Sequence, residues 1–273
     1  MHFHVQKNIL TEDEVIMYLY FDCFAGLDVF MTLGAIVNMT KDFDSAEKVC
    51  QKIYPAAKLA INPCIRAGME ADRASVEACF EGEKTRDDLL EFINALELSA
   101  FVLEHLCKYT GIKADARSVN PNDAVFDMSK EMPILCAAAA IFDAVEKMKV
   151  KNVLCSRILC SKSFTLTENG FEKVTNAETL YISKKHSLPV FETECQRELL
   201  CESGAALLGA LGAKKAEYTP GNASKIGYGA GDEDILQIIN ILRLVLGNDD
   251  EEDLLQFEMQ LELSELQTAS QTL

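Results

Sequence analysis

The stretch YLYFDCFAGLDVFMTLGA, residues 18–35, leads an apolar run into a carboxylate and a glycine turn, and a helix-like pattern follows. It predicts a buried strand over residues 17–22 and a helix over residues 31–39. In α/β proteins, ligands bind where strand ends and helix N-termini converge, so Asp22 is a candidate binding residue. The alternative is that Asp22 only caps the following helix, because aspartate is a favoured N-cap residue.

Helical and strand-like patterns alternate along the rest of the chain, which favours a mixed α/β (α+β) fold, a sheet with packed helices. Further helices are predicted over residues 45–54, 86–109, 133–148, 177–183 and 199–211. Strands are predicted over residues 59–69, 152–159 and 238–246, and a hairpin over residues 164–166 with a turn at Asn169-Gly170. Pro63 indicates that the strand over residues 59–69 lies at a sheet edge. We expect one main globular unit and an acidic C-terminal tail.

The composition excludes several classes of protein. Of 273 residues, 49% are hydrophobic and 25% charged, as in a soluble globular protein. The net charge of −17 argues against binding to nucleic acid, which attracts basic surfaces. No run of about 18 apolar residues and no signal-peptide pattern occur, so we expect no membrane span and no secretion. Ten cysteines without a CxxC pair then indicate reduced thiols in a cytoplasmic protein. The terminal pair His2 and His4 is expected to bind metal adventitiously or not at all.

Two glycine-containing stretches could serve either helix packing or ligand binding. SGAALLGAL, residues 203–211, lacks the glycine and lysine patterns of phosphate-binding loops, so Gly204 also suits a closely packed helix. IGYGAGDED, residues 226–234, has glycines at alternate positions, which allow a ligand or another strand to approach: Gly227, Gly229 and Gly231. The acids at 232–234 could hold a hard cation or form a solvated turn.

Taken together, these motifs resemble the LarC family of nickel insertion proteins, specifically the N-terminal part of its members. The resemblance rests on blocks that occur in the family's order: YFDCFAG with MTLGA, KVKNVLCS at 149–156, NG…VTNAETL at 169–180, SGAALLGAL, and IGYGAG…NILRLVLG ending at Gly247. The resemblance implies that residues 1–247 form one domain. Residues 248–273 would be the remnant start of a second domain.

The resemblance also implies an activity. Family members look like cyclometallases, which insert nickel into a pyridinium dithio-acid mononucleotide and form Ni–S and Ni–C bonds. They use cytidine triphosphate with Mn or Mg, in a separate C-terminal domain. The expected partners are therefore the pincer nucleotide or a C-terminal-domain partner protein, in a homo- or hetero-oligomer, with no nucleic acid and no membrane.

The chain departs from the family pattern where metal ligands or proton carriers are expected. The family's Gly-Asp pair is Val29-Phe30 here, and its HFHE block aligns with residues 125–128, where Asp127 is the one carboxylate. Pro133 stands in place of a helix aspartate. Because fold-building positions are kept, the alternative is a non-catalytic, diverged paralogue that acts as a binding or assembly subunit. A small-molecule binder on the same scaffold is a third alternative.

The resemblance and the remaining carboxylates together give the candidate site residues. The catalytic candidates are Asp22 and Asp127. Nickel would be held by Asp22, Asp28, Asp127 and Asp232. The candidates for binding a cofactor are Gly26, Gly204, Gly227, Gly229, Gly231, Asn240 and Arg243.

Overall fold

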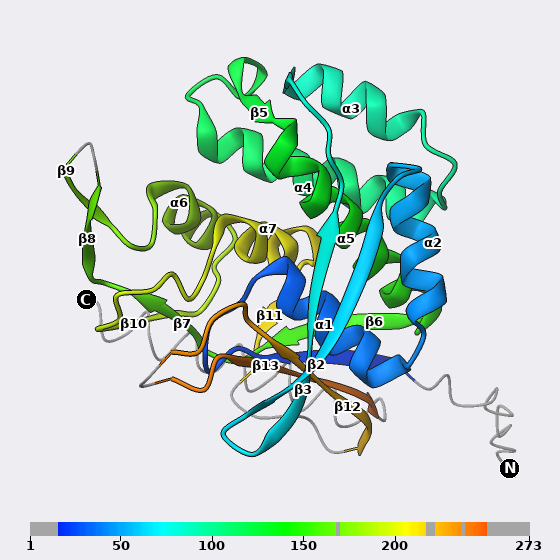
Figure 1. Ribbon diagram of the computed structural model, residues 1–273, viewed down its shortest axis with the longest axis vertical. Coiled ribbons are helices and arrows are strands. Elements are labelled where there is room, and N and C mark those ends of the chain that lie inside the picture. Colours follow the sequence, from blue (N-terminus) through cyan, green and yellow to red (C-terminus); the bar gives the residue numbers. More distant parts are fainter. Residues whose placement is uncertain (1–15, 168–169, 217–221, 236–237, 250–273) are drawn as a thin grey trace, which may run out of the picture.

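The computed structural model describes residues 16–167, 170–216, 222–235 and 238–249. A seven-stranded sheet organises them, in the order β11-β6-β1-β13-β12-β3-β2 (Figure 1). Its strands are β1 (Ile16–Asp22), β2 (Lys58–Arg66), β3 (Met69–Glu77), β6 (Val150–Cys155), β11 (Lys214–Lys215), β12 (Asn222–Ala230) and β13 (Ile241–Asp249). Because β1 runs parallel to β6 and antiparallel to β13, the sheet is mixed, and the predicted fold class is confirmed.

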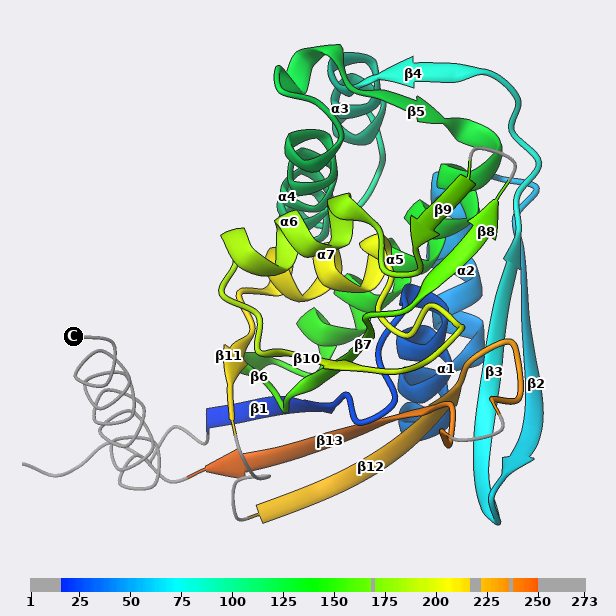
Figure 2. The ribbon, with the colours of Figure 1, turned by 90° about the vertical axis from the view of Figure 1, so that its left-hand side faces the viewer.

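The described residues form seven α-helices, which gather on one side of the large sheet (Figure 2). They are α1 (Val29–Thr40), α2 (Phe43–Ile53), α3 (Arg86–Asn94), α4 (Ala100–Arg117), α5 (Met128–Lys147), α6 (Ala177–Lys185) and α7 (Glu202–Leu211). The small sheets pair β4 (Glu83–Thr85) with β5 (Val125–Asp127), β7 (Ile158–Ser161) with β10 (Val190–Thr193), and β8 (Phe164–Thr167) with β9 (Gly170–Lys173). No helix within the described ranges is long and apolar enough to cross a membrane.

Helix α1 lies directly against the sheet because glycine leaves room for it. A Cβ atom at Gly229 of β12 would lie 1.8 Å from the carbonyl oxygen of Met31, far inside van der Waals contact. The helix starts at Asp28, whose Oδ1 accepts a hydrogen bond from Met31 N at 2.7 Å. Asp28 is therefore the N-cap residue, and the alternative that Asp22 caps this helix is wrong.

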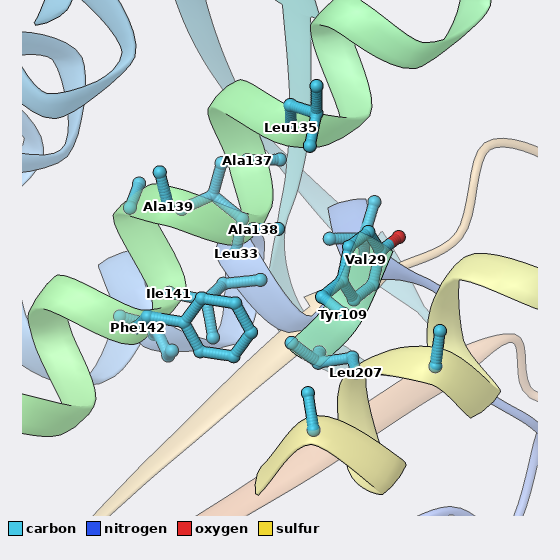
Figure 3. Close-up of a cluster of buried hydrophobic side chains, with 14 of the residues drawn as sticks. Val29, Leu33, Tyr109, Leu135, Ala137, Ala138, Ala139, Ile141, Phe142 and Leu207 are labelled. Carbon is cyan, nitrogen blue, oxygen red and sulfur yellow. The ribbon is translucent and has the colours of Figure 1, made fainter. Parts of the chain in front are cut away.

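The main core lies where α1, α4, α5 and α7 meet (Figure 3). Its fully buried side chains include Val29, Leu33, Tyr109, Phe142 and Leu207. The alanines at 137–140 are at most 2% exposed, so this part of α5 packs closely against its neighbours. All ten cysteines are free thiols.

Two predicted helices have the wrong boundaries. The pattern over residues 86–109 is split into α3 and α4, because Ser99 starts a new helix by accepting a hydrogen bond from Val102 N at 3.2 Å. Helix α5 starts well before Pro133, with Asp127 as its N-cap residue. A proline within the second turn removes one backbone hydrogen bond, but the buried face of α5 compensates for that loss.

The strand predictions hold in part. The edge strand predicted over residues 59–69 is confirmed as β2, and the hairpin is confirmed as β8 and β9. The strand predicted over 152–159 is confirmed only as far as Cys155, where β6 ends, because the chain continues into β7, which pairs with β10. His2, His4 and the tail beyond residue 249 lie outside the described residues.

Candidate functional site

The segments that precede α1 and α7 lie side by side beyond the end of β1. The chain turns at Gly26, whose φ of +95° is unfavourable for residues with a side chain. Leu27 N donates a hydrogen bond to Leu199 O at 2.8 Å, and Cys201 N donates one to Leu27 O at 3.3 Å. The segments run parallel, so both helices begin at the same end of the molecule.

A cavity of about 300 Å³ lies beside the start of α1, bounded by residues 197–199 and by the turn between β12 and β13. We call it the acidic cavity, because its lining includes four carboxylates: Asp28, Glu198, Asp232 and Glu233. Arg197 also lines it, with Nε 3.1 Å from Oε2 of Glu233. The other three carboxylates have no cationic partner among the described residues, which gives the cavity the excess negative charge that favours cations.

Two of these carboxylates hold their protons more strongly than usual. Burial raises the pKa of Asp28 to about 6; the Asp232 charge adds to the increase, and a hydrogen bond from Met31 N opposes it. The pKa of Glu198 is raised to about 7 by loss of solvation and by the charges of Asp28 and Glu202. Carboxyl groups with such pKa values exchange protons near neutral pH, as catalytic acids and bases do.

Asp22, predicted as a ligand and catalytic residue, is paired with Arg243. The two residues face each other in the register of β1 and β13, and their side chains form an ion pair. Neither lines the acidic cavity. The structure thus brings together two predicted site residues from opposite ends of the chain, while the roles given to them stay predictions.

Asp127 lies on a different part of the molecule. It ends β5, next to β4, and its Oδ1 accepts hydrogen bonds from N and Oγ of Ser129 at 3.1 and 2.6 Å. These bonds lower its pKa, so the carboxylate stays charged. Of the predicted nickel ligands, Asp28 and Asp232 share a cavity and Asp22 and Asp127 lie outside it. Within the described ranges, no three His, Cys, Asp or Glu side chains form a group that could hold a metal ion.

The predicted cofactor-binding glycines mostly face other parts of the backbone. Gly227 and Gly229 lie against α1, Gly204 against Leu27, and Gly26 against Leu199. Gly231 alone of the predicted glycines lines the acidic cavity, and its N donates a hydrogen bond to Asn240 O at 3.1 Å. Asn240 Nδ2 donates in turn to Glu233 O at 3.0 Å, which fixes this wall. Contact between these glycines and a ligand stays a prediction.

Comparison with known proteins assigns the family. A sequence profile described as nickel insertion protein matches residues 19–268, which include every residue of the acidic cavity. The chain belongs to the nickel insertion protein family. No solved structure matches the chain.

Relatives in this family are identical to the chain at about a quarter of the aligned positions. One from Geotalea daltonii, named for nickel insertion, is 26% identical over 84% of this chain and 60% of its own length. Another, the pyridinium-3,5-bisthiocarboxylic acid mononucleotide nickel insertion protein of Desulfitobacterium hafniense, is 27% identical over 86% of this chain and 59% of its own. The chain therefore spans about 60% of the length of these relatives.

Sequence reasoning missed two cavity residues, Arg197 and Glu198. They lie in an irregular segment before α7 and belong to no motif of the nickel insertion family quoted above. Their position in the chain was the available signal. Where two helix N-termini meet, the residues just before each helix can face the same ligand.

Proposed function

We propose that this chain takes part in inserting nickel into a pyridinium-3,5-bisthiocarboxylic acid mononucleotide, and that the acidic cavity receives the nickel ion. The observation that carries the proposal is the set of unpaired carboxylates at the converging helix N-termini of a nickel insertion family member. Nickel here is a substrate that passes through the cavity, so a complete coordination shell from the protein is not required.

Asp28 and Asp232 would bind the incoming Ni²⁺ through oxygen atoms. Carboxylate oxygens hold nickel less tightly than sulfur does, so the two thiocarboxylate groups of the mononucleotide would draw the ion from them. Bound Ni²⁺ must also displace the proton that Asp28 holds with its pKa of about 6, so nickel binding is expected to strengthen as the pH rises.

Glu198 would act as the proton acceptor. Formation of a Ni–C bond at a ring carbon releases the proton of that carbon. A carboxylate with a pKa of about 7 is well matched to accept it near neutral pH. Glu198 lies at the exposed rim of the acidic cavity, so it can pass the proton on to water.

Nucleotide binding would involve a part of the family that lies outside the region matched by this chain. The chain covers about 60% of the length of the matched relatives. We propose that a C-terminal domain, either in the same protein or in a partner protein, carries the site for cytidine triphosphate with Mn or Mg and works with the residues described here. Reconstitution of nickel insertion would need that domain together with this chain.

Calorimetric titration of metal-free protein with Ni²⁺ tests the proposal. The background is a His2→Ala/His4→Ala variant, which removes the terminal histidine pair. We expect near-stoichiometric micromolar binding, weakened at least about tenfold by Asp28→Asn or Asp232→Asn. Asn at position 28 can still cap α1, so the fold is kept. Asp127→Asn, a carboxylate outside the cavity, is the control. Binding no tighter than millimolar would contradict the proposal.

The alternative of a binding or assembly subunit is favoured by the hairpin of β8 and β9. Leu166 faces Phe171 across the hairpin, and Phe164 lies two residues away on the same face. These side chains are 71%, 78% and 54% exposed, an apolar face of the kind that interaction sites present. If this face mediates self-association, sedimentation will show an oligomer that Leu166→Ser/Phe171→Ser converts to a monomer. A monomer in both cases would count against self-association.

A further inference from the structure

The turn at residues 231–235, which follows β12, carries two of the four carboxylates of the acidic cavity. Asp232 and Glu233 line the cavity from this turn, whereas the third acid, Asp234, does not line it and is 79% exposed. A surface turn keeps one geometry only where its backbone is held by other parts of the molecule. The contacts that hold this turn therefore decide where the Asp232 carboxylate lies.

Three consecutive carbonyl oxygens of the turn accept hydrogen bonds from side chains. Arg66 Nη2 donates to Gly231 O, and Arg73 Nη1 donates to Asp232 O, each at 3.4 Å. The third bond, to Glu233 O, comes from the far end of the same connection, as described above. The backbone of the turn is thus fixed from β2, from β3 and from the segment before β13.

Arg66 makes the most extensive of these contacts, because it also forms an ion pair. Its Nη1 lies 2.5 Å from Asp234 Oδ1 while Nη2 reaches Gly231 O, so one planar guanidinium joins the first and fourth residues of the turn. The Arg66 side chain is 14% exposed, and salt screens a partly buried pair less than an exposed one. Because Asp234 balances the charge of Arg66 outside the cavity lining, the Asp232 carboxylate keeps its charge available to a cation.

The β2–β3 hairpin gives both arginines a fixed base. Arg66 faces Met69 across a two-residue turn, residues 67–68, whose φ values of +48° and +82° are those of a tight hairpin. Met69 and Arg73 are four residues apart in β3, so Arg66 and Arg73 lie on the same face of the hairpin. Apolar side chains of this hairpin pack against those of β12 and β13, in a cluster formed by Ala71, Ala230, Ile241, Cys64, Met69 and Tyr228.

We propose that Arg66 is a positioning residue of the acidic cavity, which holds the turn so that Asp232 meets the incoming cation. Arg73 supports the same turn through one contact. The inference rests on the proposed function of the cavity where nickel binding is measured, but the hold on the turn can be measured without metal.

Hydrogen exchange of the metal-free full chain, followed by NMR, tests the hold on the turn. The Gly231 amide donates to Asn240 O, so its exchange rate reports local opening. Arg66→Gln should speed this exchange about tenfold, through loss of a charged donor. Arg86→Gln is the matched control, because this arginine also donates to a polar side chain but lies in α3. Unchanged exchange at Gly231 in Arg66→Gln would overturn the proposal, whatever the affinity for nickel.

Nickel titration in the His2→Ala/His4→Ala background tests the effect on the cavity. Arg66→Gln should weaken binding about fivefold, and Arg66→Lys should recover only part of the loss, because an ammonium cannot span both partners. Added to Asp232→Asn, Arg66→Gln should cause no further loss, because its effect passes through Asp232. A further loss of the same size in that background would show general damage and would overturn the positioning role. A wild-type chain that binds no nickel would refute the proposed function, while faster exchange at Gly231 in Arg66→Gln would still support the hold on the turn.

Discussion

The acidic cavity and the ion pairs around Arg117 differ in how their carboxylates are paired, although both include glutamates at the start of α7. Glu198 and Glu202 stand four residues apart at the start of α7, and their charges interact. Glu202 is paired with Arg117, whereas Glu198 has no cationic partner among the described residues. The same residue type therefore leaves a negative charge unpaired in the acidic cavity and completes an ion pair with Arg117 beside it. Pairing, more than the number of carboxylates, decides what this acidic chain can bind.

The pairing of Glu202 with Arg117 belongs to an ion network inside the protein. Breaking this network should lower the free energy of unfolding more than any other change considered. Lys113, 1% exposed, has Nζ 2.5 Å from Glu131 Oε2 and 3.6 Å from Glu202 Oε2. Glu131→Ala would leave Lys113 charged and underpaired in the core. We expect the free energy of unfolding, measured in urea, to fall by about 3–5 kcal/mol.

The control for that network is an exposed pair on the same helix. Lys108 lies 2.7 Å from Glu104, and both side chains are more than half exposed. Glu104→Ala should leave the free energy of unfolding nearly unchanged, because water screens an exposed pair. A loss in Glu131→Ala as small as in Glu104→Ala would mean that water already reaches the network and screens its charges.

The next largest effect is expected at the glycine contact that places the start of α1. A Cβ atom in Gly229→Ala would meet Met31 O at 1.8 Å, so α1 and the acidic cavity must shift. We expect a loss of about 2 kcal/mol in the free energy of unfolding and weaker nickel binding. Gly111→Ala is the matched control, because a Cβ atom added to this residue of α4 would have no atom within 4 Å, and the variant should gain about 0.5–1 kcal/mol. Similar changes in the free energy of unfolding of Gly229→Ala and Gly111→Ala would contradict the close contact between Gly229 and Met31.

Much of the fold could be predicted from local patterns, because burial imposes a period on each element. Local patterns predicted the strand that ends at Asp22, the alanine-rich helix α5 and the edge strand β2, which contains a proline. Local patterns did not predict the break between α3 and α4, because the apolar spacing continues across it and one capping serine, Ser99, starts the new helix. Sheet order was also out of reach, because it depends on contacts between residues far apart in the chain.

The candidate site was less predictable than the fold. The resemblance to the family located Asp28 and Asp232, which share the acidic cavity, but it could not show that Arg243 pairs with Asp22. Glu198 belongs to none of the matched motifs, and only the parallel approach of two segments brings it to Asp28. Charge pairing in three dimensions is a property of the fold, so a list of carboxylates in the sequence cannot give it.

A smaller effect should appear in the pH dependence of stability. The pKa of Asp28 is raised to about 6 in the folded protein, above that of an unfolded aspartate, so the folded state binds the proton more tightly. Stability from this group is therefore present at low pH and is lost as the pH rises from about 4 through 6. Asp28→Asn cannot ionise and should become more stable relative to the wild type by about 1 kcal/mol for each pH unit of that interval. Urea unfolding at a series of pH values measures the difference, and parallel profiles would contradict it.

The smallest effect is expected at Asp22, the residue at which strand β1 ends. Its partner Arg243 is 40% exposed, so Asp22→Asn should lower the free energy of unfolding by less than about 1 kcal/mol. Because the Asp22 carboxylate is already paired and lies outside the acidic cavity, we expect the nickel affinity to stay within about twofold of the wild type. Asp28→Asn, measured in the same titration, gives the reference value for the loss of nickel affinity. A loss in Asp22→Asn as large as in Asp28→Asn would mean that Arg243 releases Asp22 to the metal, and the nickel site would then extend from the acidic cavity to the end of β1.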